Sequence, residues 1–353
     1  MILGLDIGRQ VVKMVTMEVN KQKIKILDVG ERSLFDVNQT YDPDKVSKPY
    51  WAMAIKELFS HKGLKPKKIR NLITALNGTH ASIKQITTLD MSKDELLSAM
   101  IFEARKHIPM DGTDAVVDYQ IFGENTKEMD KIDVGLVACT KRTLTAHLDL
   151  LKEVGLKPGI VETEVTAITN IFTYTHEMPD EGLYVILNIG ALSTSIIVMG
   201  RVAEYFTREI PIGSFQMVQD IMKKRKVSHL DAVSILQKDG IESLKTDQDM
   251  DSSLSVGVSV ADRSIFDNFV EDIRRSLRYY AKSTGQSFFL KIFLTGGASN
   301  LPGITEFIQS KLNVDTELFN PFEALDFNDD LDVQNPFQYT VALGLALRGG
   351  LHE

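Results

Sequence analysis

Two stretches of this 353-residue chain place polar residues at the turn of an apolar hairpin, where a phosphate could bind. In the first, "LDIGRQVVK", Asp6 ends an apolar segment, Gly8 follows at the turn, and Lys13 lies on the returning segment. Glycine permits the backbone angles of a tight turn and lets a phosphate approach the main-chain amides. The carboxylate could hold a hydrated magnesium ion, and the lysine could reach a phosphate as a point charge. One such hairpin is a weak signal, because a plain hairpin with a surface aspartate has the same pattern.

A second hairpin, "YVILNIGALSTSIIVMG", repeats this arrangement and strengthens the phosphate interpretation. Asn188 stands near the end of its first strand, and the turn supplies a glycine, main-chain amides and hydroxyls at Gly190, Ala191, Leu192, Ser193 and Thr194. A third glycine turn, "FLTGGASNLPGI", follows a strand, and Gly296 and Gly297 would let a flat adenosine lie close to the backbone. The three turns together predict a clamp for ATP across a cleft.

Composition bounds the class of protein that could carry this clamp. The length suggests two domains, and the net charge of −8 argues against a nucleic-acid binder. The single cysteine, Cys139, excludes an intramolecular disulfide and a cysteine cluster for zinc. We expect no signal peptide and no spanning helix, hence a cytoplasmic protein that could still sit on a membrane through a partner.

The elements that position the first turn read as a sheet packed by helices. The hairpin pairs Ile2–Ile7 with Val11–Val19, and residues 23–34 continue the alternation as a third strand. A helix over Pro49–Ser60 and a strand over 69–77 follow.

From about Ile83 the pattern indicates an insert of roughly 80 residues. "SKDE" at 92–95 reads as a capping box, and the helix it starts is expected to stop at Pro109. Strands at 115–123 and 131–140 and a helix over Thr143–Val154 complete the insert. The apolar face predicted for the first of these helices comprises Leu96, Leu97, Met100, Ile101, Ala104 and Ile108.

The second half repeats the first in outline. A hairpin at 183–199 leads to a strand at 201–210 and a helix from Ser214, and the polar stretch 242–264 reads as an irregular loop. The elements expected after it are helix 264–283, strand 291–297, helix 301–312 and a closing helix at 340–349.

This order of motifs resembles the actin-like ATPase superfamily over essentially the whole chain. Two stretches narrow the resemblance: "FEARKHIPM" followed by "VVDYQIFG", and "EDIRRSLRYYAKS" before the third turn. These look like the PilM family of type IV pilus assembly proteins, which is related to FtsA. The resemblance implies an α/β fold of two actin-like domains with duplicated mixed sheets, an interdomain nucleotide cleft, and a subdomain inserted in the first domain. The implied divisions are 1–82, 83–162 (inserted), 163–182, 183–213, 214–285 and 286–353.

The resemblance also implies roles for individual residues. Glu164 matches the connecting-helix acid that helps order metal and water, and Asp6 and Asn188 stand at the magnesium positions, acting through water. The matching nucleotide-binding positions are Gly8, Arg9, Gln10, Lys13, Gly190, Ala191, Leu192, Ser193, Arg274, Arg275, Gly296, Gly297 and Ala298. Each has a plain alternative: the two arginines could be a solvated helix face, and Glu164 a surface acid.

Two departures from the superfamily pattern affect the expected activity. Arg9 and Gln10 stand where small hydroxyl residues are expected, so that Arg9 could grip a phosphate or obstruct the site. Asn188 replaces an expected aspartate, and an amide adds no negative charge and takes no proton. We therefore expect ATP binding with very slow hydrolysis, and a gain in hydrolysis for Asn188→Asp.

The function implied is a cytoplasmic ATP- and magnesium-binding scaffold for type IV pilus assembly. Its partner in the resembled family is the N-terminal cytoplasmic tail of PilN, an inner-membrane protein, held in a groove between the first domain and the insert. Two alternatives stay open, a sugar-kinase-like phosphotransferase and an FtsA-like division protein.

Overall fold

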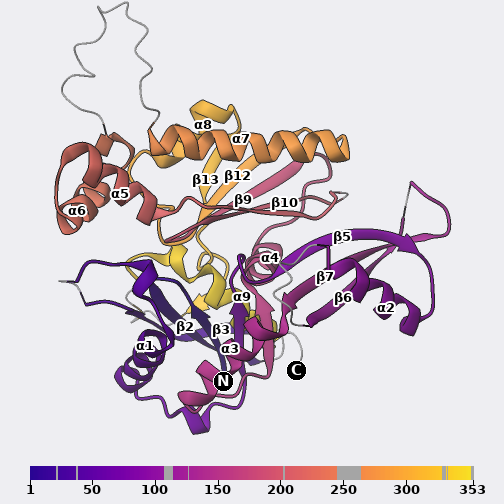
Figure 1. Ribbon diagram of the computed structural model, residues 1–353, viewed down its shortest axis with the longest axis horizontal. Helices are drawn as coiled ribbons and strands as arrows, with labels where there is room; N and C mark the ends of the chain where they lie inside the picture. The colour runs from indigo at the N-terminus through magenta and orange to yellow at the C-terminus, as the bar shows by residue number, and fades with distance from the viewer. Residues whose placement is uncertain are drawn as a thin grey trace, which may run out of the picture.

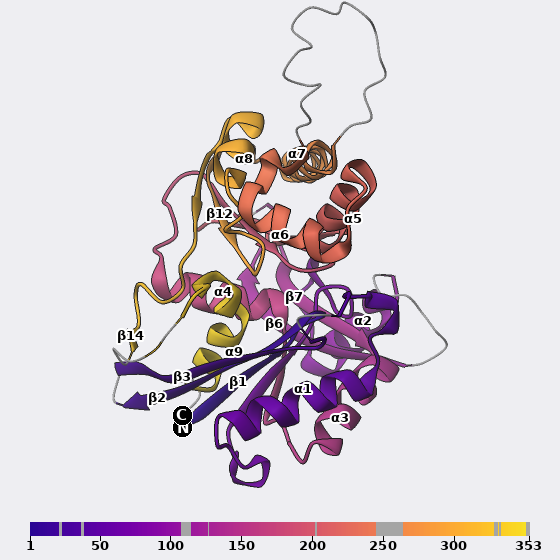
Figure 2. The same cartoon turned by 90° about the vertical axis from the view of Figure 1, so that its left-hand side faces the viewer.

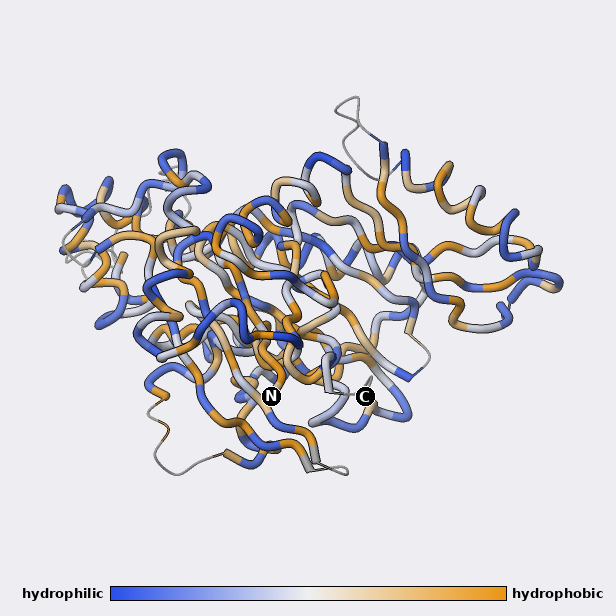
Figure 3. The backbone as a smooth tube through the Cα atoms, turned by 90° about the horizontal axis from the view of Figure 1, so that it is seen from below, coloured by the Kyte–Doolittle hydropathy of each residue, from blue (hydrophilic) through white to orange (hydrophobic). Residues whose placement is uncertain are grey.

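The two halves of the chain stack on one another, and a smaller lobe projects from the side of the first half (Figure 1). This computed structural model describes residues 1–350 except 21–22, 37–38, 107–113, 126, 202, 245–263, 328–330 and 332. The predicted loop at 242–264 therefore lies mostly outside the described residues. Hydrophobic segments run through the centre of the molecule, and the peripheral loops are mostly hydrophilic (Figure 3).

The first half is built on a six-stranded sheet in the order β14-β3-β2-β1-β4-β8. A hairpin of antiparallel strands is extended on one side by two parallel strands, β4 and β8, and on the other by the short β14. The strands are β1 (Ile2–Ile7), β2 (Val11–Asn20), β3 (Lys23–Ser33), β4 (Leu72–Leu76), β8 (Ile160–Thr163) and β14 (Asp326–Phe327).

The second half repeats this sheet in the order β11-β10-β9-β12-β13. Again an antiparallel hairpin, here β9 and β10, is flanked by one further antiparallel strand and two parallel ones. The expectation of duplicated mixed sheets is confirmed. The strands are β9 (Leu183–Ile189), β10 (Thr194–Met199), β11 (Phe206–Ile210), β12 (Phe289–Thr295) and β13 (Asp315–Leu318).

Two helices, α4 (Glu164–Thr175) and α9 (Thr340–Gly350), lie between the sheets (Figures 1 and 2). Their apolar side chains share one buried cluster with residues of both sheets. The helices approach closely because position 344 is glycine, where a Cβ would lie 1.9 Å from the carbonyl oxygen of Ala167. The two sheets are thereby fixed around a common centre, with their hairpin turns facing one another.

The outer faces of the two large sheets are covered by helices other than α2 (Figure 1). Helices α1 (Lys48–His61) and α3 (Lys141–Glu153) pack on the first sheet, with the short η1 (Pro43–Lys45) and η2 (Pro66–Lys68) nearby. The second sheet carries α5 (Ser214–Arg225), α6 (His229–Asp239), η3 (Gly240–Leu244), α7 (Ile265–Thr284) and α8 (Ile304–Leu312), and η5 (Pro336–Tyr339) leads into α9.

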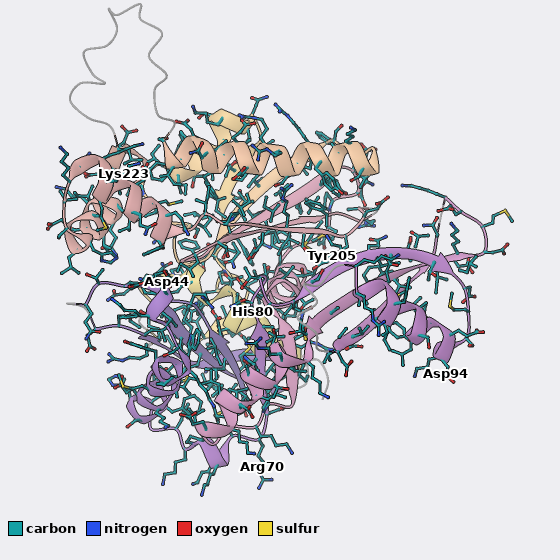
Figure 4. All side chains as sticks on the ribbon, viewed as in Figure 1. Asp44, Arg70, His80, Asp94, Tyr205 and Lys223 are labelled. Atoms are coloured by element: carbon teal, nitrogen blue, oxygen red, sulfur yellow. The ribbon has the colours of Figure 1, made fainter. Side chains whose placement is uncertain are left out.

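The projecting lobe is a three-stranded sheet, β5-β7-β6, carrying one helix. Its elements are β5 (Ser82–Leu89), α2 (Lys93–Ala104), β6 (Ala115–Glu124) and β7 (Lys131–Thr140). The lobe also touches the second half: Gln85 accepts from the amide of Tyr205 at 2.7 Å, and Lys127 pairs with Glu204 at 2.8 Å. Figure 4 labels Tyr205 where the two parts meet.

The lobe differs from the expected insert in extent and in its helix. Helix α3 packs in the core of the first half and β8 joins its sheet, so the separate lobe covers 82–140 rather than 83–162. The capping box is present, with the amide of Ser92 donating to Glu95. Leu96, Met100 and Ala104 are buried, but Leu97 and Ile101 are exposed, because the small sheet covers only one narrow side of α2. Ile108 and Pro109 lie outside the described residues.

Candidate functional site

A cavity of about 480 Å³ lies between the two sheets, where the three predicted turns converge. Its volume is within the range of small-molecule sites. Of the residues predicted for a site, those lining it are Asp6, Gly8, Arg9, Gln10, Lys13, Glu164, Asn188, Gly190, Ala191, Leu192, Ser193, Gly296, Gly297 and Ala298. Residues far apart in the sequence are therefore brought together as a single pocket.

The first turn is braced by aromatic side chains. Trp51 on α1 donates from Nε1 to the carbonyl of Gly8 at 3.0 Å, and the Tyr41 hydroxyl donates to the carbonyl of Arg9 at 2.9 Å. The Arg9 guanidinium carbon lies 5.8 Å from the centre of the Trp51 ring. A Cβ at Gly8 would lie 2.4 Å from the carbonyl oxygen of Val11, so this turn requires glycine.

The acid and the base of the first hairpin are paired with each other. Lys13 Nζ donates to Asp6 Oδ2 at 2.6 Å, and both side chains are mostly buried. The two residues are directly opposite in the β1–β2 register, which brings them to the same face of the sheet. The hairpin thus presents a neutralised pair to the cavity rather than an isolated carboxylate.

The second turn is braced by main chain. The amide of Gly190 donates to the carbonyl of Ser193 at 2.9 Å, and the amide of Ser214, at the start of α5, donates to the carbonyl of Gly190 at 3.0 Å. The Thr194 hydroxyl is turned away to the carbonyl of Ile212 at 2.8 Å. Of the hydroxyls expected to face a phosphate, only that of Ser193 borders the cavity.

A row of polar side chains crosses the second sheet beside this turn. Asn188 is opposite Ser195 in the β9–β10 register, and Ser195 is opposite Glu209 in β10–β11. The hydroxyls of Ser193 and Ser195 donate to Glu209 Oε1 at 3.2 and 3.1 Å. Across the cavity, Asn188 donates from Nδ2 to Glu164 Oε1.

The pKa values of Glu164 and Glu209 are both raised. Burial, with smaller contributions from the Glu209 and Asp6 charges, raises the pKa of Glu164 from 4.5 to about 8, against the Lys13 charge and a hydrogen bond from the Gly78 backbone. Burial also raises the pKa of Glu209, against the hydrogen bonds from Ser193 and Ser195. Strongly shifted acids inside a cleft are typical of functional sites. This end of the cavity can favour a cation or hold a proton.

The third turn lies close against the end of β9. Gly296 has φ +94°, a conformation that favours glycine, and a Cβ there would lie 2.5 Å from Asn188 Oδ1 and 2.6 Å from the carbonyl oxygen of Ile189. Only glycine at 296 leaves room for the Asn188 side chain.

Arg274 and Arg275 do not line the cavity. Arg274 pairs with Glu271 and donates to the carbonyl of Lys311 at 2.7 Å, and Arg275 pairs with Asp272 at 3.1 Å. Both therefore make contacts along α7 and its neighbour α8, which fits their plain alternative as helix-surface residues.

Several lining residues have no motif that would predict them from sequence. They are Asn77, Thr79, His80, Glu209, Pro211, Ser214, Gln338 and Val341. Figure 4 labels His80 in the centre of the molecule, in the loop after β4. Burial and the Arg9 charge lower the pKa of this histidine, which favours its neutral form. The one sequence feature that could have pointed to Glu209 as a lining residue is its place on the strand that follows the second hairpin.

A second cavity, of about 510 Å³, adjoins the first. Three residues, Arg9, Asn77 and His80, line both cavities. The remaining wall comes from the first half, chiefly from α1, the end of β4 and α3: Ile7, Lys48, Trp51, Ala75, Leu76, Arg142, Thr143, Ala146, His147, Asp149 and Leu150. The second cavity is thus lined by the first half alone, outside the lobe at 82–140.

Among the described residues, no three His, Cys, Asp or Glu side chains are grouped so that they could hold a metal ion by themselves. A search of the same residues for a helix of membrane-spanning length and apolarity found none.

Comparisons with known proteins agree with this architecture. The family described as type IV pilus assembly protein PilM matches residues 4–350. The solved PilM-PilN type IV pilus biogenesis complex contains a chain 23% identical, with TM-score 0.79, covering 99% of this chain and 98% of that one. Ethanolamine utilization protein EutJ from Carboxydothermus hydrogenoformans is 11% identical, with TM-score 0.54, covering 98% of this chain and 88% of that one. The family match favours a pilus protein over the kinase and division-protein alternatives.

Proposed function

The chain belongs to the PilM family of type IV pilus assembly proteins, and we propose that it serves pilus assembly as an ATP-binding scaffold with weak or absent hydrolysis. The observation that carries ATP binding is the convergence of all three glycine turns on one cavity of about 480 Å³. In this proposal the turns at Gly8 and Gly190 face the phosphates, and the turn at Gly296 and Gly297 carries the adenosine.

The cavity suits a magnesium ion that arrives with the nucleotide. Magnesium is usually bound through one or two carboxylates together with substrate phosphates and water. Asp6, Glu164 and Glu209 line the cavity, and Asp6 already has Lys13 as its partner. Glu164 and Glu209 would hold the ion's water shell, and the ion would supply neutralisation of the phosphate charge.

Weak hydrolysis is supported by the state of the acids. Burial raises the pKa of Glu164 to about 8, which favours its protonated form at neutral pH when no ion is bound beside it. Asn188 contributes an amide in place of an acid, and Lys13 neutralises Asp6. The site is better suited to holding ATP than to activating water.

We further propose that the N-terminal tail of a PilN-like protein occupies the second cavity. The solved relative is a complex with PilN, and an extended tail binds by placing apolar side chains in pockets. The second cavity offers apolar walls at Ile7, Trp51 and Leu76. Attachment to a PilN-like inner-membrane protein would place this chain at the cytoplasmic side of that membrane.

Calorimetry with ATP and magnesium tests the nucleotide proposal. Lys13→Ala should weaken binding by about 1–3 kcal/mol, since a charged hydrogen-bond partner of the phosphates is lost. Lys62→Ala is the matched control, because Lys62 pairs with Asp28 at 2.7 Å in the same domain but outside the cavity. Absence of ATP binding to the wild-type protein would refute the proposal, and equal binding by both variants would remove Lys13 from the site.

The tail proposal is tested with a labelled PilN N-terminal peptide and point variants of α3. Ala146→Trp fills the second cavity and should abolish peptide binding, whereas Thr145→Trp, at an exposed neighbour outside the cavity wall, should not. Deleting 83–162 is unsuitable, because it would remove α3 and β8 from the first domain. Unchanged peptide affinity in Ala146→Trp would place the tail elsewhere.

A further inference from the structure

Asn188 is held between two fixed groups at the centre of the molecule. It lies on β9, hydrogen-bonded between β10 and β12, and only 5% of its surface is exposed. On one side its Oδ1 faces Gly296, where the missing Cβ leaves room for it. On the other side its Nδ2 donates to Glu164 Oε1. The side chain has no freedom to turn toward a ligand without losing these neighbours.

Glu164 is the first residue of α4, and its position depends on side-chain contacts. Residue Thr163 caps this helix, its hydroxyl accepting from the amide of Thr166 at 3.1 Å. The cap fixes the start of the helix, and the Glu164 carboxyl group itself accepts a hydrogen bond from the Gly78 backbone. The Asn188 amide is the side-chain group that meets this carboxyl group, from the opposite domain. This contact joins the helix between the sheets to the second hairpin.

An amide can maintain this contact in either protonation state of the acid. The NH₂ group that faces Glu164 donates to an ionised carboxylate, and it donates equally to the carbonyl oxygen of a carboxylic acid. An aspartate has no donor when ionised, and two carboxyl groups in contact must share a proton or repel. Asp6 and Glu209 already line this end of the cavity, so a further acid would add to an existing excess of carboxyl groups.

We propose that Asn188 is a positioning residue that acts through Glu164, holding its carboxyl group toward the nucleotide cavity across the domain boundary. The amide is then the group this site requires, and its presence is not a lost metal-side acid. This inference rests on the proposed nucleotide function. It changes one expectation from the sequence. If Asn188 were only a lost acid, Asn188→Asp would increase ATP hydrolysis; on the present proposal, Asn188→Asp should instead weaken Mg²⁺–ATP binding.

A double-mutant cycle tests the proposal with four proteins: wild type, Asn188→Ala, Glu164→Ala and the double variant. The measurement is the Kd for ATP with Mg²⁺ by calorimetry. Asn188→Ala should weaken binding about 5-fold or more in the wild-type background and less than about 2-fold in the Glu164→Ala background, where no acceptor is left. Equal effects in both backgrounds would overturn the proposal, because a merely structural asparagine acts independently of Glu164.

The free energies of unfolding of the same four proteins, measured in denaturant without nucleotide, give the interaction energy between residues 188 and 164 independently of ATP. If the wild type binds no ATP, the proposed function fails, and this second cycle still decides whether the two side chains act as one unit. Asn188→Ser guards against a variant that does not fold: its hydroxyl both donates and accepts, so it should recover part of the affinity that Asn188→Ala loses. Serine no better than alanine, or a gain in Mg²⁺–ATP binding and hydrolysis for Asn188→Asp, would also contradict the proposal.

Discussion

The two phosphate hairpins share a backbone plan but carry different electrostatics. In the first, the end-of-strand acid Asp6 is neutralised within its own hairpin by Lys13 at 2.6 Å. In the second, Asn188 is uncharged and its contact is with Glu164, an acid from a helix of the other half. The acid of the first hairpin is therefore neutralised within that hairpin, whereas the second hairpin is linked by a side-chain hydrogen bond to α4. Duplicating the fold has not duplicated the chemistry.

The turns also differ in what holds them. Side chains of Trp51 and Tyr41 brace the carbonyls of the first turn, whereas the start of α5 braces the second through main-chain bonds. Side-chain braces can be removed one at a time by substitution, and main-chain braces cannot. The first turn is consequently the one in which sequence changes should be felt most directly.

The largest expected difference is between the two turn glycines. A Cβ at Gly8 would lie 2.4 Å from the carbonyl oxygen of Val11, and one at Gly190 would lie 3.0 Å from that of Ser193. Forcing backbone apart costs about 1–3 kcal/mol, so we expect Gly8→Ala to lose about 2–3 kcal/mol of unfolding free energy and Gly190→Ala about 1 kcal/mol or less. Denaturant unfolding measures both. Equal losses would mean that the turns have equivalent packing.

The next effect concerns the pH dependence of stability, and it tests Glu164, whose hydrogen-bond partner Asn188 is uncharged. Because the pKa of Glu164 is raised from 4.5 to about 8, the folded protein keeps a proton that the unfolded chain releases. This group therefore lowers stability as pH rises from 4.5 toward 8, with no further change above that. Glu164→Gln should gain at least about 1 kcal/mol relative to wild type between pH 5 and pH 8, since one pKa unit equals about 1.4 kcal/mol.

The measurement is denaturant unfolding at several pH values, without nucleotide or metal. Comparing the two proteins at each pH removes any constant cost of the substitution itself. A difference in unfolding free energy that stays flat from pH 5 to 8 would show that Glu164 is already ionised in the folded protein.

A smaller effect is expected on removing one brace from the first turn. Trp51→Phe keeps a ring beside Arg9 but removes the N–H that donates to Gly8 at 3.0 Å. The loss should be about 1 kcal/mol, the net value of one hydrogen bond. Hydrogen–deuterium exchange should quicken at the turn over residues 8–10 and stay unchanged at 190–193. Tyr41→Phe, which removes the bond to the carbonyl of Arg9, should act in the same place.

The smallest effect marks the limit of the site. Arg274→Ala should change ATP affinity by less than about 0.5 kcal/mol, because this half-buried side chain pairs with Glu271 on its own helix and lies outside the cavity. Calorimetry beside Lys13→Ala gives the comparison. A loss as large as that of Lys13→Ala would return Arg274 to the nucleotide site.

Much of this arrangement is local, and for that reason the sequence predicts it. The strands at 2–7, 131–140 and 183–189 follow from their apolar residues. The turns at Gly8 and Gly190 follow from glycine next to polar residues. The boundary of the inserted lobe is less predictable, because α3 and β8 have the same local pattern whichever sheet they join. Only packing assigns them to the first half.

The sequence by itself determined that two similar glycine hairpins and a third glycine turn would form, since repeated local patterns fold alike. Their meeting at one cavity follows from the packing of both sheets around α4 and α9. Tertiary structure alone decided which acids face that cavity and what they contact. Glu209 enters through the register that sets it opposite Ser195, and Glu164 meets Asn188 only because α4 lies between the two sheets. Strand register and helix placement depend on contacts between distant segments, and side-chain charge and hydrogen bonding follow from those contacts.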